Sequence, residues 1–205
     1  MKQYSALTLI TALAVCVSQF AHAQGNKEAA KFAREGAEAS KNQDWNKAIE
    51  AFRKATDLDR KFAPNLAIVY QQRGFASANE QKFEDAIRDF SEALKINSQD
   101  ARIYEQRAAV EMKMNDYDKA LADYSEAITL KPNEVRYYLY RSYIYETKGD
   151  VKNSLADTER ALKLDPGNAE AKSRKARLEA RQSLNAPPTP IPSSPRPSPA
   201  ATKSP

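Results

Sequence analysis

The chain has 205 residues, with 32 Lys and Arg against 27 Asp and Glu, a formal net charge of +5, one cysteine and one histidine. Because Cys16 and His22 both lie within residues 1–23, the remaining sequence lacks thiol nucleophiles, disulfides, imidazole bases and the usual zinc ligands. We therefore expect no enzyme, no cofactor and no metal site. The small net charge also argues against a nucleic-acid partner.

Residues 1–23 are typical of a secretory signal peptide, with a basic start, an apolar run over residues 6–17 and a small-x-small cleavage site that ends at Ala23. The apolar run is shorter than the roughly 20 residues that a membrane span needs. Val15 disfavours lipid attachment at Cys16, because the bacterial lipoprotein signal requires a small residue there. We expect cleavage after Ala23 and a periplasmic or secreted protein without stable membrane insertion.

The central sequence repeats itself with a period of 34 residues, and the similar segments FEDAIRDFSEALKINSQ, YDKALADYSEAITLKPN and VKNSLADTERALKLDPG begin at Phe83, Tyr117 and Val151. A further, weaker copy, which is the first in chain order, begins at Trp45, four residues further upstream than the period requires. A fixed period of this size indicates stacked supersecondary units.

Each copy divides into two predicted helices, because Asn and Asp residues that can cap a helix precede the second half of every copy. Pro132 and Pro166 mark the ends of second helices, and Pro64 lies four residues beyond the corresponding place. We therefore expect a longer second helix in the first copy. A final helix over residues 169–184 should act as a polar cap, its apolar side formed by Ala169, Ala176, Leu178 and Ala180.

The repeated positions carry a resemblance to a known family. Small residues recur at Gly36, Gly74, Ala108 and Ser142 and again at Ala48, Ala86, Ala120 and Ser154; an early aromatic recurs at Phe32, Tyr70, Tyr104 and Tyr138; prolines close later copies. In these features the chain resembles the tetratricopeptide repeat (TPR) family. The fourth copy departs from the pattern, with Thr158 where the other copies have Phe52, Phe90 and Tyr124.

The resemblance implies an all-α fold, a right-handed α-solenoid of four TPR helix pairs plus a C-terminal capping helix. The TPR domain is expected over residues 24–185, with repeats at about 29–62, 67–100, 101–134 and 135–168. Residues 186–205 hold eight of the eleven prolines and are predicted to be a disordered tail. That tail has two interpretations: a spacer, or a proline-rich ligand around Pro192-Ser-Ser-Pro195.

Arginine and aspartate occur together in three copies, at Arg73, Arg107 and Arg141 with Asp89, Asp123 and Asp157 sixteen residues later. The first copy lacks both, with Glu35 and Ala51 instead. Their joint presence and absence predicts that they contact each other as partly buried salt bridges. The arginines share a helix face with Tyr104, Ala108 and Glu111 and their counterparts, a face expected to meet the partner helix.

The other face of each first helix is where proteins resembling this family hold partner segments. We expect the partner-binding groove to consist of Ile68, Gln72, Phe75, Arg102, Gln106, Arg136, Leu139, Tyr140 and Tyr143. Aromatic and arginine side chains dominate binding energy at interfaces, so Phe75, Tyr140 and Tyr143 are the predicted anchors. Arg102 and Arg136 are expected to select acidic or carbonyl-rich segments. The competing interpretation is that these are solvated or self-covered faces. A family clamp for a terminal carboxylate is incomplete here, because Ala33 and Ala37 stand in its Lys and Asn positions.

The sequence therefore predicts an exported adaptor that binds a protein or peptide segment in its concave groove. The alternative is a self-associating structural protein, a homo-oligomer whose groove holds its own tail or a second protomer. A carboxylate-dependent enzyme would need a convergent acidic cluster, and the predicted groove offers only Glu105 and Glu146.

Overall fold

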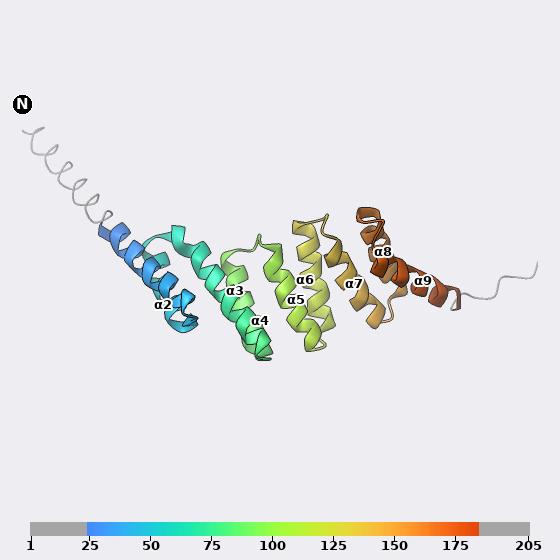
Figure 1. Ribbon diagram of the computed structural model, residues 1–205, viewed down its shortest axis with the longest axis horizontal. Coiled ribbons are helices and arrows are strands. Elements are labelled where there is room, and N and C mark those ends of the chain that lie inside the picture. Colours follow the sequence, from blue (N-terminus) through green and yellow to red (C-terminus); the bar gives the residue numbers. More distant parts are fainter. Residues whose placement is uncertain (1–23, 185–205) are drawn as a thin grey trace, which may run out of the picture.

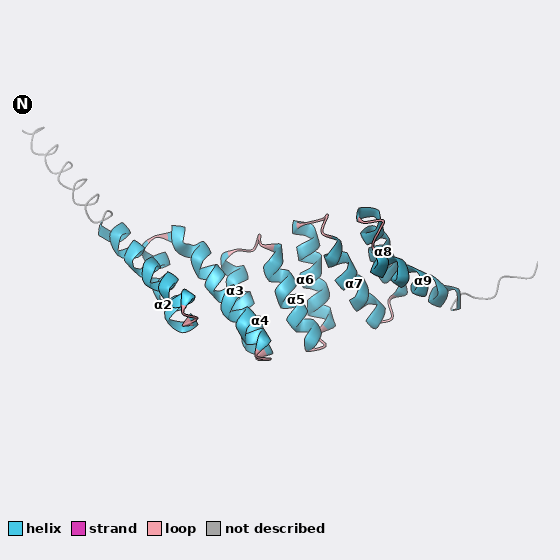
Figure 2. Ribbon diagram, viewed as in Figure 1, coloured by secondary structure: helices cyan, strands magenta, loops and turns pink. Residues whose placement is uncertain are grey.

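The computed structural model describes residues 24–184, and within that range helices follow one another along a single row (Figure 1). The described chain is helical over residues 24–41, here called the leading helix, and its remaining elements are α2 (Trp45–Leu58), η1 (Arg60–Phe62), α3 (Ala63–Asn79), α4 (Phe83–Ile96), α5 (Ala101–Lys113), α6 (Tyr117–Leu130), α7 (Val135–Thr147), α8 (Val151–Leu164) and α9 (Ala169–Leu184). Short loops join them, and residues 24–184 contain no strand (Figure 2).

This arrangement is the predicted all-α solenoid: four helix pairs, from the leading helix with α2 to α7 with α8, followed by α9. Each helix packs chiefly against its neighbours in the chain, which is how a repeat stack buries its core. No helix within residues 24–184 is long and apolar enough to cross a membrane. The predicted signal peptide and proline-rich tail lie outside the described residues.

The turn inside each helix pair has the same backbone geometry. Gln43, Gln81, Asn115 and Gly149 have φ angles of 61°, 63°, 60° and 81°, and they occupy equivalent places in the four copies. A left-handed residue at this point reverses the chain after the first helix. Three of the four positions are not glycine, so the left-handed turn is a property of the repeat and does not depend on that residue type.

The four residues inserted after the first copy lie elsewhere than predicted. α2 has 14 residues, as do α4, α6 and α8, so the expected longer second helix is wrong. The inserted residues instead form η1 and start α3 early, which makes α3 17 residues long. Pro64 lies in the first turn of α3, where its missing N–H costs no hydrogen bond and its fixed φ favours helix formation.

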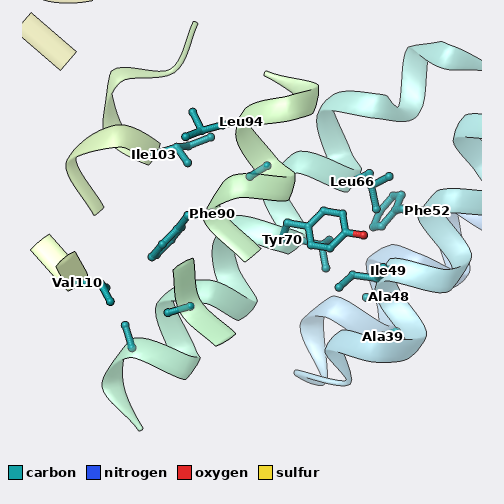
Figure 3. Packing of buried hydrophobic residues seen from close by; sticks show 14 residues of the cluster. Ala39, Ala48, Ile49, Phe52, Leu66, Tyr70, Phe90, Leu94, Ile103 and Val110 are labelled. Carbon is teal, nitrogen blue, oxygen red and sulfur yellow. The ribbon is translucent and has the colours of Figure 1, made fainter. Parts of the chain in front are cut away.

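A small residue on each first helix makes room for a large side chain on its partner. A Cβ atom added to Gly36 would lie 2.7 Å from the ring of Phe52, and one added to Gly74 would lie 3.1 Å from that of Phe90. These rings are buried, together with apolar residues of the following copy. Figure 3 shows side chains of α2, α3, α4 and α5 converging in one such cluster. The small positions therefore set how closely the paired helices approach.

The fourth copy fills the same space with hydroxyl groups. Ser142, Ser154 and Thr158 are fully buried, and the Ser142 Oγ lies 3.0 Å from the Ser154 Oγ and 2.7 Å from the Thr158 Oγ1. The Ser154 hydroxyl also donates to the Ser142 carbonyl, and the Thr158 hydroxyl to the Ser154 carbonyl. Every hydroxyl in this group has a partner, which removes the penalty for burying it.

α9 closes the row with a different face from the one predicted. Its buried residues are Ala171, Arg174 and Leu178, whereas Ala169, Ala176 and Ala180 are exposed. The prediction was right for Leu178 and wrong for the alanines, because it assumed that a basic residue faces solvent. Arg174 instead lies buried and donates through Nη1 to the carbonyl of Leu139 and through Nη2 to Glu170.

Candidate functional site

The predicted arginine–aspartate contacts are confirmed in all three copies. The Nε atoms of Arg73, Arg107 and Arg141 donate to aspartate oxygens at 2.7, 2.7 and 2.8 Å, and each Nη2 donates to the second oxygen of the same carboxylate, that of Asp89, Asp123 or Asp157. This bidentate geometry is the strong form of the arginine–carboxylate pair. The hydrogen bond to the aspartate raises the pKa of each arginine, so every guanidinium stays charged.

Each of these guanidinium groups also reaches back to the preceding copy. Arg107 Nη1 donates to the Ser91 Oγ at 2.9 Å, and Arg141 Nη1 donates to the Ser125 Oγ at 2.9 Å. Arg73 Nη1 also reaches the preceding copy, but at a different repeat position, where it donates to Asn46 of α2 at 2.7 Å. One side chain therefore joins the two helices of its own copy and the stack between copies, which is a structural role.

Glu111 lies near the Arg107–Asp123 pair. It is 3% exposed, and its Oε2 has no hydrogen-bond partner. Burial and the nearby Asp123 raise the pKa of Glu111 to about 7, while Arg107 opposes the rise. Burial therefore makes the Glu111 carboxyl harder to ionise than an ordinary glutamate.

A first hollow lies where α3 meets the start of α2 and the middle of α5. We call it the amide-lined hollow; its volume is about 460 Å³ and its lining is Gln43, Trp45, Gln71, Gln72, Phe75, Ala76, Asn79 and Gln106. Gln71 donates to Gln106 at 2.6 Å across the gap between copies. Phe75, 53% exposed, is the apolar side chain that this hollow presents most openly.

A second hollow lies between α5, α6 and α7. We call it the tyrosine-lined hollow; its volume is about 370 Å³ and its lining is Glu105, Ala109, Met112, Lys113, Tyr117, Tyr124, Tyr140 and Tyr143. Tyr140 stacks on Tyr124 with ring centroids 5.4 Å apart, and the guanidinium of Arg174 lies 5.7 Å from the ring centroid of Tyr143. Burial raises the pKa of Tyr124, so its phenol stays protonated. Tyr140 and Tyr143 are each 45% exposed.

The predicted groove residues divide between these hollows. Gln72, Phe75 and Gln106 line the amide-lined hollow, and Tyr140 and Tyr143 line the tyrosine-lined one. Ile68 is half exposed on α3 and lies outside both. Leu139 corrects the prediction: it is 9% exposed and packs with Tyr138, Ala161 and Ala171, because α8 and α9 cover that side of α7.

The two predicted selecting arginines are already engaged within the chain. Arg102 donates through Nε and Nη2 to Asp100 at 3.2 and 3.0 Å. Arg136 forms ion pairs with Glu105 at 3.1 Å and with Glu134 at 3.7 Å. Burial raises the pKa of Glu105, and its pair with Arg136 opposes that rise. Neither arginine lines either hollow, so the hollows themselves present aromatic side chains and no guanidinium group.

Residues from second helices also line the hollows, which sequence reasoning missed. Trp45 begins α2, and Tyr117 and Tyr124 belong to α6. Their repeat positions indicated core packing, and Tyr124 is indeed buried at one edge. The sequence signal that could have identified them is the aromatic residue that recurs at the first position of second helices, such as Trp45 and Tyr117. Residues 24–184 contain no group of three or more His, Cys, Asp or Glu side chains placed to hold a metal ion.

Comparisons with known proteins agree with the geometry. Tetratricopeptide repeat family models match residues 101–134 and residues 135–168. The solved Arabidopsis OM64 TPR domain is 28% identical with a TM-score of 0.53, over 58% of this chain and 98% of that domain. The second TPR domain of human RPAP3, solved with the HSP70 peptide SGPTIEEVD, is 26% identical with a TM-score of 0.52, over 57% and 98%.

The solved structure of YrrB matches a longer part of this chain. The match covers 79% of this chain and 82% of YrrB, with a TM-score of 0.59 and 20% identity. YrrB is described as a TPR protein with an unusual peptide-binding site. At this identity the match shows the fold alone. A search of curated proteins finds no match.

Proposed function

Because this chain is a tetratricopeptide repeat protein, we propose that it is a scaffold that binds a protein or peptide segment on the face carrying the two hollows. The observation that carries the proposal is the exposure of Phe75, Tyr140 and Tyr143 in hollows on the first helices. Convergent exposed aromatics mark interaction sites, since isolated ones are common but grouped ones are not. The proposal is for an interaction protein and not for an enzyme.

One of the similar structures supports the proposal. The second TPR domain of human RPAP3, 26% identical to this chain, was solved with the HSP70 peptide SGPTIEEVD. We propose that this chain binds segments other than the acidic peptide bound to RPAP3. Ala33 and Ala37 lack the groups of a carboxylate clamp, and Arg102 and Arg136 already form ion pairs with Asp100 and Glu105. The acidic peptide SGPTIEEVD should therefore bind this chain poorly.

We further propose that the scaffold works after export, with residues 1–23 removed and no lipid attached. The support is the basic, apolar and small-x-small pattern of those residues. N-terminal sequencing of the protein from its native host should begin at Gln24. A modified Cys16 at the N-terminus would instead mean a membrane-tethered protein.

The test of the binding surface is Tyr143→Ala. Peptides selected from a random displayed library on the chain should bind the variant at least about 30-fold more weakly, the equivalent of about 2 kcal/mol. Because Tyr143 is 45% exposed, the thermal midpoint should stay nearly unchanged. Leu58→Ala is the matched control, since Leu58 is 44% exposed but lines neither hollow.

Two outcomes would contradict the proposal. Selected peptides that bind Tyr143→Ala and Leu58→Ala equally well would show that the hollow takes no part in binding. A variant that unfolds while keeping its residual affinity would place Tyr143 in the core. The alternative role, self-association into a structural homo-oligomer, predicts instead a concentration-dependent mass in light scattering.

A further inference from the structure

We propose that the tyrosine-lined hollow is the docking site of this chain's own proline-rich segment, residues 186–205, which thereby competes with a partner for that hollow. The inference rests on the proposed function, because it names what occupies one part of the same surface. It concerns Tyr117, Tyr124, Tyr140 and Tyr143, the four aromatic side chains of that hollow.

The chemistry of the hollow fits prolines. Grooves that bind proline-rich segments are lined by aromatic side chains, against which the apolar pyrrolidine rings pack. A polyproline II chain makes no internal hydrogen bonds and so offers bare carbonyl groups. Tyrosine supplies both complementary features, a ring face and a phenolic donor. Tyr140 and Tyr143 present these features at the surface, and the stack of Tyr140 on Tyr124 holds one ring in place.

The amide-lined hollow is less suited to the same segment. Five of its eight lining residues are Gln or Asn, namely Gln43, Gln71, Gln72, Asn79 and Gln106. Half of the hydrogen-bonding capacity of an amide is an acceptor that needs an N–H donor, and proline residues have none. An ordinary peptide backbone can satisfy those acceptors. The two hollows thus differ in the backbone that they favour, and the tyrosine-lined one favours proline.

The segment is long enough and starts close enough to reach. α9 ends at Leu184, and Arg174 of the same helix already contacts the Tyr143 ring. Ten helical residues separate Arg174 from Leu184, which is about 15 Å. A polyproline II chain rises about 3.1 Å per residue, so about five residues cover that distance. Pro190 and the prolines after it remain available for the hollow.

Tethering makes even weak docking effective. A connection of only a few residues gives the segment a local concentration in the millimolar range. A contact with a dissociation constant of about 100 μM between separate molecules would then keep the hollow about nine-tenths occupied, and a separate peptide would still bind measurably. A partner must displace the segment, and the segment therefore sets a threshold of partner affinity or concentration.

The experiment uses the chain with Pro190→Ala, Pro192→Ala, Pro195→Ala and Pro197→Ala, which changes no residue of the described helices. The probe is a labelled synthetic peptide of residues 186–200, followed by fluorescence anisotropy. It should bind the four-proline variant, and bind the unaltered chain at least about tenfold more weakly because the attached segment competes. Adding Tyr143→Ala to the variant should abolish binding, whereas adding Phe75→Ala should not.

Equal binding to the unaltered chain and the four-proline variant, or equal binding with and without Tyr143→Ala, would overturn the inference. So would competition in the unaltered chain that disappears on dilution, since a second copy would then donate the segment. Library peptides separate the two proposals: if they lose affinity with Tyr143→Ala while the proline peptide binds nothing, the scaffold stands and self-docking falls.

Discussion

The third copy (residues 101–134) and the fourth copy (residues 135–168) share one backbone plan and differ inside it. The third packs the ring of Tyr124 among Ala108 and Ala120, and the fourth replaces these residues with Thr158, Ser142 and Ser154. All six side chains are essentially inaccessible to solvent. The repeat therefore accepts an aromatic interior or a hydroxyl network, provided that the residues change as a set.

The comparison extends to the ionic layer. Arg107 and Arg141 make matching bidentate pairs with Asp123 and Asp157. The third copy has the buried Glu111 next to its pair, and the fourth has Tyr145 at the equivalent place. The third copy thus combines a large aromatic core with a buried carboxyl whose Oε2 has no hydrogen-bond partner, and the fourth combines a hydroxyl core with a tyrosine at that place. Substitutions in one copy at a time can test each of these differences separately.

The largest effect is expected for the aromatic core. Tyr124→Ala should lower the free energy of unfolding by about 3–5 kcal/mol, because it removes a buried ring and leaves a cavity. Thr158→Ala removes one hydroxyl whose partner Ser142 keeps its contact with Ser154, so the loss should be about 1–2 kcal/mol. Urea unfolding of both variants measures the difference. Equal losses would mean that the two interiors are not distinct in energy.

The next effect concerns the ion pairs. Arg107→Met should cost about 3 kcal/mol and Arg141→Met about 1 kcal/mol less. Both changes strand a buried aspartate, but Asp123 is also left near the Glu111 carboxyl, whose pKa it already raises. Denaturant unfolding at pH 8 measures both. A double-mutant cycle of Arg107 with Asp123 serves as the control, and a coupling energy near zero would show that the contact contributes nothing to stability.

The smallest effect is a pH dependence confined to the third copy. Folding raises the pKa of Glu111 from the ordinary 4.5 to about 7, so the folded chain binds the proton more tightly. Stability from this group is complete below pH 4.5 and falls as pH rises toward 7. Glu111→Gln should therefore gain about 2 kcal/mol over the unaltered chain on going from pH 5 to pH 8. The exposed Glu126→Gln is the matched control, and identical pH profiles for all three chains would contradict the assignment.

Features that recur with the period could be predicted from sequence. The helix pairs follow from spacing, and the arginine–aspartate contacts follow from residues that are present or absent together. Such patterns repeat the same physical constraint several times, so one copy checks another. Phe75, Tyr140 and Tyr143 are exposed, as the repeat pattern predicts, whereas their part in binding stays a prediction.

Features that occur once could not be predicted in this way. The four inserted residues start α3 early because Pro64 suits a first helical turn, which spacing alone does not indicate. The buried face of α9 was missed because Arg174 satisfies its charge with a backbone carbonyl and Glu170. Leu139 was assigned to the groove because the covering of α7 by α8 and α9 depends on how the last copy is capped.

The arginine contacts between copies have a mechanical consequence. A solenoid that is bent or stretched opens at the interfaces between its repeats, as a coil spring opens between its turns. The guanidinium groups of Arg107 and Arg141 span two of those interfaces through Ser91 and Ser125, and they stiffen the middle of the row. At the first interface, which contains the inserted η1, Arg73 donates to Asn46. Each interface between successive copies is therefore held by a guanidinium hydrogen bond that must break before the repeats can separate.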